Sequence, residues 1–254
     1  MMKKLIGIIF SLLIPVCSYG DTLLTDLVSH WKLNETSDTR ADSHGSNPLL
    51  DYNTVGYSNA ILGNGANFIF GNNETLYADD STSLSLGADT PFTISFWVYA
   101  RDADYNALQQ HYGAGGYPAS MFYIDGNSKL GFSVTNGVTW TTVPTTDNFP
   151  INEWHFIVGW HDPDADVIYL QIDNGTIYEK DHSAGTFDAS GLWYVGASGS
   201  TSGDSIIDSM SFWKRILTIN ERTSLYGDGS GLDYESFSGG STPIPLKRRI
   251  IISE

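Results

Sequence analysis

Carboxylates are the residues of this sequence whose spacing can be tested first against a known chemistry. Retaining hydrolysis of a glycosidic bond needs two carboxyl groups roughly 5 Å apart, one of them held protonated. A β-strand can supply such a pair, because residues i and i+2 share one face. No glutamate here has a second glutamate within five positions: they are Glu35, Glu74, Glu153, Glu179, Glu221, Glu235 and Glu254. The expected central strands, "TISFWVYA" and "MFYI", contain no acid, so glycoside hydrolysis is the least favoured function.

Other catalytic motifs are also missing from the sequence. It has no Gly-x-Ser-x-Gly elbow, no His-Glu-x-x-His and no phosphate-binding glycine loop. His155 and His161 flank an expected strand, where we interpret them as structural residues with hydrogen-bond partners. "DPDAD" imitates the start of an EF-hand loop, but Val167 stands where that loop needs glycine, so we interpret it as an acidic turn. We therefore predict that the chain is not an enzyme.

One carboxylate does stand in an unusual setting, within "GDSIIDSMSFWKR". Period-two alternation would place Asp208 on the same strand face as Ile206, Met210 and Phe212. Burying an unpaired ionised carboxylate costs several kcal/mol or makes it take up a proton. We predict that Asp208 either binds a cation or accepts several backbone N–H groups.

Residues 1–20 have the features of a secretory signal. Lys3 and Lys4 precede the apolar run "LIGIIFSLLIPV", and "SYG" provides a cleavage site. The apolar run is short for a membrane span, so we expect no transmembrane segment in the mature chain. Cleavage would remove Cys17, the only cysteine, and leave a chain with no disulfide and no thiolate nucleophile. These features predict a secreted protein, extracellular or at the cell surface.

The chain is strongly acidic, with a formal net charge of −16. Such a charge argues against nucleic acid and anionic membranes as partners. It is equally consistent with cation binding and with simple solubility.

The rest of the sequence predicts an all-β sandwich or barrel with one short helix near its end. Aromatic and β-branched segments recur between turn signals, and Asp125-Gly126, Asn136-Gly137 and Asn174-Gly175 suit hairpin turns. Thr218 and Glu221 form a capping box at the start of the helix, and Gly227 ends it. We expect one domain over 21–235, followed by a linker and a basic, apolar tail over 236–254.

Seven motifs occur in an order that is similar to LamG-like jelly-roll domains. They are "LVSHWKLNE", "ADSHGSN", "GNGANFIFGNNETLYADD", "FTISFWVYARD", "EWHFIVGW", "IYLQIDNG" and "IIDSMSFWKRILTINERTSLYG". These domains are related to pentraxins within the concanavalin A-like lectin/glucanase superfamily. The resemblance covers about residues 27–226 and implies a jelly-roll sandwich of two antiparallel sheets, one of them concave.

The same resemblance implies a structural calcium ion. In relatives of this fold, calcium often ties an N-terminal loop to the last strand, and their aspartate in that strand aligns with Asp208. The acid that follows it in the family is Ser209 here. Ca²⁺ takes several oxygen ligands, and the opening loop offers Glu35 and Asp42 as companions of Asp208.

Strand alternation also predicts a ligand-binding surface. In "PFTISFWVY" and "DVIYLQI" the aliphatic and phenylalanine side chains are expected to point inward, which leaves the remaining residues outward. Aromatic rings beside amide and hydroxyl groups suit sugars, because the C–H faces of sugars stack on such rings. The predicted ligand-binding residues are Trp97, Tyr99, Tyr169 and Gln171 of these strands, joined by Trp140 of "VTWTTV" and by Tyr112 and Tyr117 of the glycine-rich "HYGAGGYP".

The function predicted from the sequence is a non-catalytic module that binds a glycan or a cell-surface polysaccharide. The alternative is a structural or adhesive surface component that mediates protein–protein assembly. In that case the tail, whose "RRIIIS" has strand character, could add to a sheet edge of a protein partner.

Overall fold

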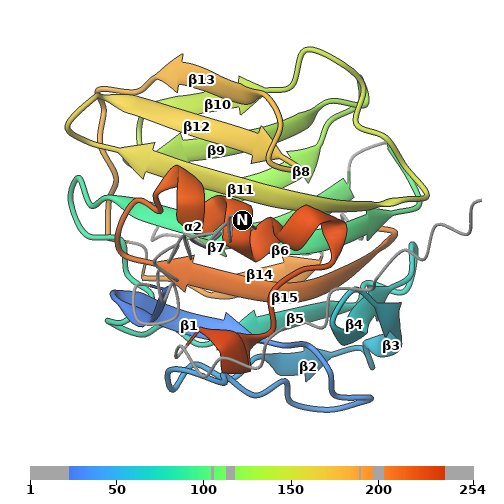
Figure 1. Ribbon diagram of the computed structural model, residues 1–254. Helices are drawn as coiled ribbons and strands as arrows, with labels where there is room; N and C mark the ends of the chain where they lie inside the picture. The colour runs from blue at the N-terminus through green and yellow to red at the C-terminus, as the bar shows by residue number, and fades with distance from the viewer. Residues whose placement is uncertain (1–22, 104–105, 113–117, 189, 197–202, 238–254) are drawn as a thin grey trace, which may run out of the picture.

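The protein folds into two antiparallel β-sheets packed face to face (Figure 1). The computed structural model describes residues 23–103, 106–112, 118–188, 190–196 and 203–237. Figure 1 looks onto the sheet that carries helix α2 (Ile219–Tyr226); we call this the front sheet, and the sheet behind it the back sheet. The predicted two-sheet jelly-roll sandwich is confirmed.

The two sheets differ in strand order. The front sheet has the order β13-β12-β11-β6-β15-β4-β3, with β1 also paired to β15. Its strands are β1 (Leu27–Trp31), β3 (Gly56–Ala60), β4 (Gly63–Phe68), β6 (Phe92–Ala100), β11 (Trp154–Asp162), β12 (Val167–Ile172), β13 (Ile177–Asp181) and β15 (Ser205–Trp213). The back sheet has the order β10-β9-β8-β7-β14-β5-β2. Its strands are β2 (Leu50–Tyr52), β5 (Thr75–Ala78), β7 (Asn106–Tyr112), β8 (Pro118–Ile124), β9 (Leu130–Thr135), β10 (Trp140–Pro144) and β14 (Trp193–Gly196).

The main core lies between the sheets and follows the predicted alternation. In β6, Phe92, Ile94, Phe96 and Val98 all point into it and are fully buried. Aromatic rings from the two sheets interlock there, as where Phe96 meets Phe122 of β8 edge-on at 5.1 Å between ring centroids. At Gly159 a Cβ atom would lie 2.5 Å from the Phe122 ring, so this close approach of the sheets requires glycine.

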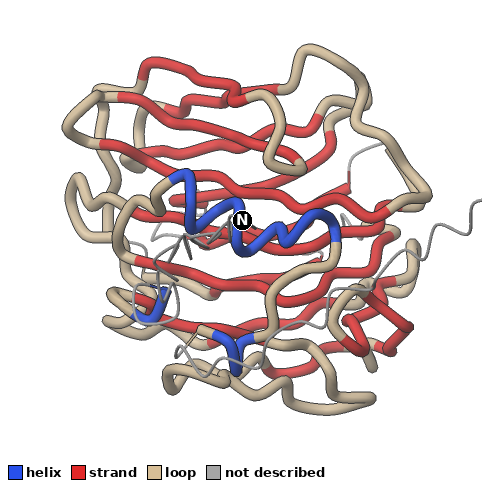
Figure 2. The backbone as a smooth tube through the Cα atoms, in the orientation of Figure 1, coloured by secondary structure: helices blue, strands red, loops and turns tan. Residues whose placement is uncertain are grey.

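A second apolar cluster covers the outer face of the front sheet. Helix α2 crosses that face, as Figure 2 shows, and the segment after it continues through η1 (Gly227–Gly229) and η2 (Tyr234–Ser236). The cluster consists of Leu23, Leu27, Trp97, Phe156, Val158, Trp160, Trp213, Leu217, Leu225 and Phe237. None of the described helices is long and apolar enough to cross a membrane.

The ends of this covering segment test two predictions. The capping box of Thr218 and Glu221 is present, and Gly227 closes the helix in the left-handed conformation, as predicted. The predicted domain end at residue 235 is too early, because Phe237 is 1% exposed and packs against Trp213 and His30. The folded domain therefore includes Phe237; residues 1–22 and 238–254 lie outside the described part of the chain.

A β-bulge in β15 changes the predicted face of Asp208. Ser209 has φ of 49°, and the pairing with β6 shifts between Asp208, opposite Trp97, and Ser211, opposite Ser95. One extra residue before Met210 reverses the alternation. Met210 and Phe212 therefore point into the main core, whereas Asp208 points to the outer face with Trp97. The prediction that these three residues share a face is wrong.

The hairpin turns lie where the sequence places them, with two differences in detail. Between β8 and β9 the left-handed residue is Ser128, with φ of 60°, and not Gly126. Gly137 adopts positive φ between β9 and β10. Between β12 and β13 the two left-handed residues are Asp173 and Asn174, with φ of 51° and 55°, one position earlier than the predicted pair. Asparagine and aspartate tolerate this conformation because their short polar side chains can form local hydrogen bonds.

Candidate functional site

Asp208 lies beside the hairpin that joins β3 to β4. Its side chain is fully buried, and Oδ2 accepts the N–H group of Leu62 at 2.9 Å. Oδ1 has no hydrogen-bond partner among the described residues. Burial raises the pKa of this carboxyl from 3.8 to about 7, against the lowering effect of the backbone N–H groups of Leu62, Ser209 and Ile61. Asp208 thus accepts backbone N–H groups and anchors the hairpin tip, which is the second of its two predicted roles.

The residues predicted to hold calcium do not form one cluster, although Glu35 Oε2, like Asp208 Oδ1, is buried without a partner among the described residues. Asp42 accepts four backbone N–H groups at 2.9 to 3.1 Å, so both its oxygens are engaged by the turn around it. Glu35 Oε1 accepts the N–H group of Ala41 at 2.8 Å. Within the described ranges no three His, Cys, Asp or Glu side chains could share a metal ion. The structure thus shows no cluster that joins Glu35, Asp42 and Asp208, and calcium binding stays a prediction.

Two predicted ligand-binding residues are buried beneath α2. Trp97 is 2% exposed, and its ring stacks on Tyr226 at 5.8 Å between centroids. The Gln171 amide donates to the carbonyl of Gly175 at 3.0 Å, and its oxygen accepts from Arg222 Nε at 2.9 Å. Both residues do point outward from the front sheet as predicted, but the helix covers them. They cannot contact a ligand in this fold.

The other predicted ligand-binding residues lie on two different sheets. Tyr99 and Tyr169 are half-buried on the front sheet, where they pack against Trp154 and Trp160. Tyr112 and Trp140 belong to the back sheet, and Trp140 is 41% exposed. Tyr117 lies outside the described residues. The structure therefore does not bring the predicted set together on one surface.

The outer face of the back sheet carries a continuous row of side chains, one from each strand. Trp193, Val195, Phe122 and Phe132 point into the core, so their chain neighbours point outward. Register then aligns these outward residues across the sheet, and we call them the cross-strand row: Leu50, Tyr77, Tyr194, Gln110, Met121, Ser133 and Thr142.

The middle of the cross-strand row offers an unused hydrogen-bond acceptor beside aromatic rings. Gln110 is 4% exposed, and its Oε1 atom has no partner in the described part of the chain. Tyr194 is directly opposite Gln110, and the Tyr112 ring meets the Tyr194 ring edge-on at 5.6 Å. The pKa of the Tyr194 phenol is raised, mainly by burial and to a smaller extent by the neighbouring Tyr112 and Tyr77. This hydroxyl therefore stays protonated and can donate a hydrogen bond.

One end of the row is bordered by further polar groups. Ser133 and Thr142 hydroxyls lie 2.7 Å apart, and the indole N–H of Trp140 donates to Thr142 at 3.0 Å. On the other side of the row, a Cβ at Gly131 would lie 3.1 Å from the Tyr123 ring, so this ring packs flat against the sheet. The face thus combines flat rings with hydroxyl and amide groups, which is the chemistry that sugars require.

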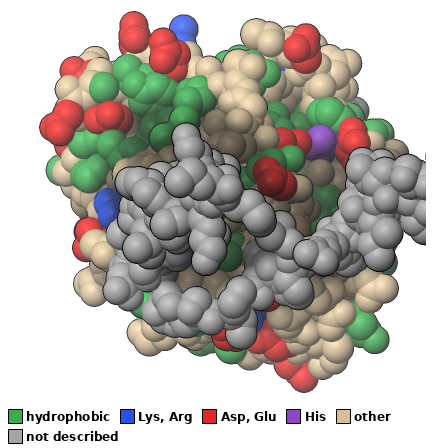
Figure 3. Space-filling model, viewed as in Figure 1, with side chains coloured by type: hydrophobic (Ala, Val, Ile, Leu, Met, Phe, Trp, Pro, Cys, Tyr) green, Lys and Arg blue, Asp and Glu red, His purple; other side chains and the backbone are tan. Residues whose placement is uncertain are grey.

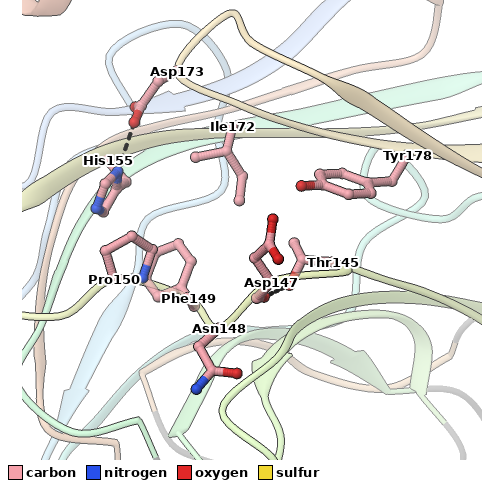
Figure 4. Close-up of a pocket in the computed structure, with 9 residues that line it drawn as sticks. All are labelled: Thr145, Asp147, Asn148, Phe149, Pro150, His155, Ile172, Asp173 and Tyr178. Atoms are coloured by element: carbon pink, nitrogen blue, oxygen red, sulfur yellow. Dashed lines mark hydrogen bonds and ion pairs between the residues drawn. The ribbon is translucent and has the colours of Figure 1, made fainter.

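A pocket of about 210 Å³ forms a second candidate, shown in Figure 4. His155 Nδ1 lies 2.6 Å from Asp173 Oδ2, while the Asp147 carboxylate and the Tyr178 hydroxyl point toward the middle of the pocket. Thr145, which is the one serine or threonine in its lining, donates its hydroxyl to the Asp147 carbonyl at 2.8 Å. A His–Asp pair without an available nucleophile does not form a catalytic triad. The pairing agrees with the structural role predicted for His155.

Sequence reasoning missed Tyr77, Tyr194 and Gln110. The signal was present, because "TLYA" and "WYVG" are short strands in which a tyrosine alternates with buried apolar residues. Their alignment into one row depends on the order of seven strands, and Gln110 follows a bulge between Ala107 and Gln109. Neither the order nor the bulge can be read from local alternation.

Comparisons with known proteins agree with this architecture. The model of the concanavalin A-like lectin/glucanases superfamily matches residues 59–221, which is more than half of the chain. Comparison with curated proteins gives no match to this sequence. Among solved structures, the binding domain of Paraclostridial Mosquitocidal Protein 1 superposes with a TM-score of 0.67 at 15% identity, over 80% of this chain and 52% of that one.

Two further structures illustrate the range of similar folds. Domain 4 of AbnA, a GH43 extracellular arabinanase from Geobacillus stearothermophilus, in complex with arabinotriose, has a TM-score of 0.62 at 16% identity, over 82% of this chain and 98% of that one. The binding domain of botulinum neurotoxin serotype G has a TM-score of 0.62 at 13% identity, over 79% of this chain and 50% of that one. The chain thus spans about half the length of the two toxin binding domains, and identities this low establish a common fold only.

Proposed function

Since the chain belongs to the concanavalin A-like lectin/glucanases superfamily, we propose that it is a secreted, non-catalytic carbohydrate-binding module. Its ligand lies on the outer face of the back sheet. The observation that carries this proposal is the buried, unpartnered Oε1 of Gln110 beside the Tyr194 ring. An acceptor without a partner costs about 1–3 kcal/mol when buried. Gln110 is 4% exposed, so a sugar hydroxyl satisfies this oxygen once the Gln110 side chain turns outward on binding.

The surroundings of Gln110 support sugar rather than peptide as the ligand. Tyr77, Tyr112 and Tyr194 offer ring faces and phenol hydroxyls within one patch of the sheet. Sugar C–H faces stack on such rings while their hydroxyls find hydrogen bonds. Domain 4 of the arabinanase, whose structure includes arabinotriose, lends support to a sugar ligand by its similar fold alone.

The proposed module does not cleave its ligand. Retaining hydrolysis would need two carboxyl groups about 5 Å apart on the ligand face. None of the outward residues of the cross-strand row is an acid. The expected secretory signal supports action outside the cell.

A polysaccharide-binding panel tests the proposal. Purified protein is titrated against soluble glucans, xylans, mannans and arabinans, using wild type, Gln110→Ala, Tyr194→Ala and the control Tyr57→Ala. Tyr57 is a 52% exposed tyrosine on β3 of the front sheet. We expect at least one polymer to bind and both back-sheet substitutions to weaken it about tenfold or more, a change of about 1.4 kcal/mol.

Two results would contradict the proposal. Undiminished binding by Gln110→Ala and Tyr194→Ala would place the ligand elsewhere on the molecule. Failure of every polymer to bind, together with capture of a defined surface protein, would favour the alternative of an adhesive component.

A further inference from the structure

The strands of the back sheet are almost free of charged side chains. In all seven strands only Asp51 and His111 belong to the Asp, Glu, Lys, Arg and His types. Asp51 stands opposite the core residue Leu76, and His111 stands opposite the core residue Trp193, so both point inward. The outer face of the back sheet is therefore uncharged along every strand.

This uncharged face belongs to a strongly acidic protein. The chain carries 29 acidic and 13 basic residues, and acidic side chains outnumber basic ones on the opposite, front face (Figure 3). A carboxylated or sulfated ligand would meet no cation on the strands of the back sheet and would lose water from its charges without compensation. The negative field of the whole protein would add repulsion.

The cross-strand row is also long. Neighbouring strands lie about 4.8 Å apart, so the five steps from Tyr77 to Thr142 span roughly 24 Å. A single sugar ring would cover only part of this distance. Tyr77 and Tyr194 offer half-buried rings, Met121 a thioether and Thr142 a hydroxyl, while Gln110 and Ser133 between them are buried, so a chain laid along the row would meet only neutral groups.

We infer that the cross-strand row selects an uncharged, extended polysaccharide that lies across the strands, and discriminates against polymers that carry carboxylate or sulfate groups. This inference rests on the proposed function and names the class of ligand for the same site. Recognition would come from stacking and neutral hydrogen bonds, with no ion pair to the sugar.

Matched polymers test this selectivity directly. Hydroxyethyl cellulose and carboxymethyl cellulose share a backbone, as do laminarin and its carboxymethylated form, so each pair differs mainly in charge. We expect the neutral member to bind at least tenfold more tightly at 20 mM NaCl. The gap should narrow at 500 mM NaCl, because salt screens repulsion, yet persist because the uncharged strands still desolvate the ligand.

Charge-insertion variants provide the matched control. Met121→Lys places one cation within the cross-strand row, whereas Tyr57→Lys adds the same charge to the exposed edge of the front sheet. We expect Met121→Lys to raise affinity for the carboxymethylated polymers severalfold and Tyr57→Lys to leave it nearly unchanged. If the two variants change affinity equally, the preference for neutral polymers is set by the net charge of the protein and not by the outer face of the back sheet. That result would overturn the inference.

Oligosaccharides of increasing length test the extended chain. Affinity should rise from the monosaccharide to an oligomer of several units of whichever neutral polymer binds. A monosaccharide that competes as well as its hexamer would overturn this part of the inference. Equal binding of neutral and carboxymethylated polymers, with loss in Tyr194→Ala, would overturn the selectivity and leave the proposed function standing. Absence of binding to every polymer would overturn both.

Discussion

The outward faces of the two sheets arise from the same alternation of side chains, but one is covered by a helix and the other is not. On the front sheet the outward residues include Trp97, Phe156 and Trp160, and helix α2 with its following segment covers them. On the back sheet they include Tyr77, Tyr194 and Gln110, and no described helix crosses them. Large aromatic rings such as those of tryptophan and phenylalanine need cover to be removed from water, whereas the half-buried tyrosines Tyr77 and Tyr194 carry a hydroxyl that water can solvate. The composition of an outward face thus indicates whether it becomes core or surface.

Removing Trp97 should give the largest change. The ring is buried between β6 and α2, so Trp97→Ala is expected to lower the free energy of unfolding by about 3–5 kcal/mol. Urea melts followed by fluorescence would measure it. A cost below about 1 kcal/mol would mean that the helix does not seal this face and that the two faces are alike.

Asp208 should make the covered face sensitive to pH. Its pKa rises from 3.8 in the unfolded chain to about 7 in the fold, so the folded state holds more protons between these values. The free energy of unfolding must therefore fall as pH rises through this window. At three pKa units and about 1.4 kcal/mol per unit, Asp208→Asn should stabilise the protein at pH 8 by up to about 4 kcal/mol. It should have little effect near pH 4.

Calcium and Asp42 provide the controls for this experiment. If Ca²⁺ binds Asp208, the bound ion will favour the ionised carboxylate of Asp208. Chelation with EDTA will then lower the melting temperature of wild type but not of Asp208→Asn. Asp42→Asn exchanges an acceptor oxygen for an amide donor in a turn that needs four acceptor contacts. We expect it to destabilise by roughly 2 kcal/mol at pH 8, opposite in sign to Asp208→Asn.

Two truncated chains test where the segment that covers the front sheet ends. A chain ending at Glu235 loses Phe237, whereas a chain ending at Phe237 keeps its contacts with Trp213 and His30. We expect the shorter chain to be less stable by about 3 kcal/mol and the longer one to melt like the full chain. Equal melting temperatures for both truncated chains would show that Phe237 adds nothing to the stability of the cover.

The smallest change in stability is expected on the back sheet. Tyr194 is half-buried, so Tyr194→Ala should alter the free energy of unfolding by no more than about 1 kcal/mol. The same variant should lose about tenfold or more in polysaccharide affinity. A large loss of stability without loss of binding would show that Tyr194 is a packing residue and remove the contrast between the faces.

Much of the fold could be predicted from the sequence, because local alternation decides which side chains point inward. The inward set of β6 and the caps of α2 follow from nearest-neighbour chemistry. The face of Asp208 does not, since the bulge at Ser209 uses a serine in the left-handed region, where glycine would have given a signal. The cover over Trp97 comes from residues more than a hundred positions away, which no local pattern specifies.

The candidate site was harder to predict for the same reason. Tyr112 and Trp140 were named from the sequence, but their neighbours on the back sheet come from strands distant in sequence. Gln110 and Tyr194 are 84 positions apart and become neighbours only through the β7–β14 pairing. A site made by strand order needs the order to be known first.

The position of β15 has a consequence for biosynthesis. It is the last strand of the chain among the described residues, yet it pairs with β6, β4 and β1 in the middle of the front sheet. The ribosome must therefore release residue 213 before that sheet can close, so the nascent chain stays open during most of its synthesis. Closing contacts between segments this distant is slow. A front sheet that closes only after its last strand emerges would be compatible with threading through a secretion channel, the route that the N-terminal sequence predicts.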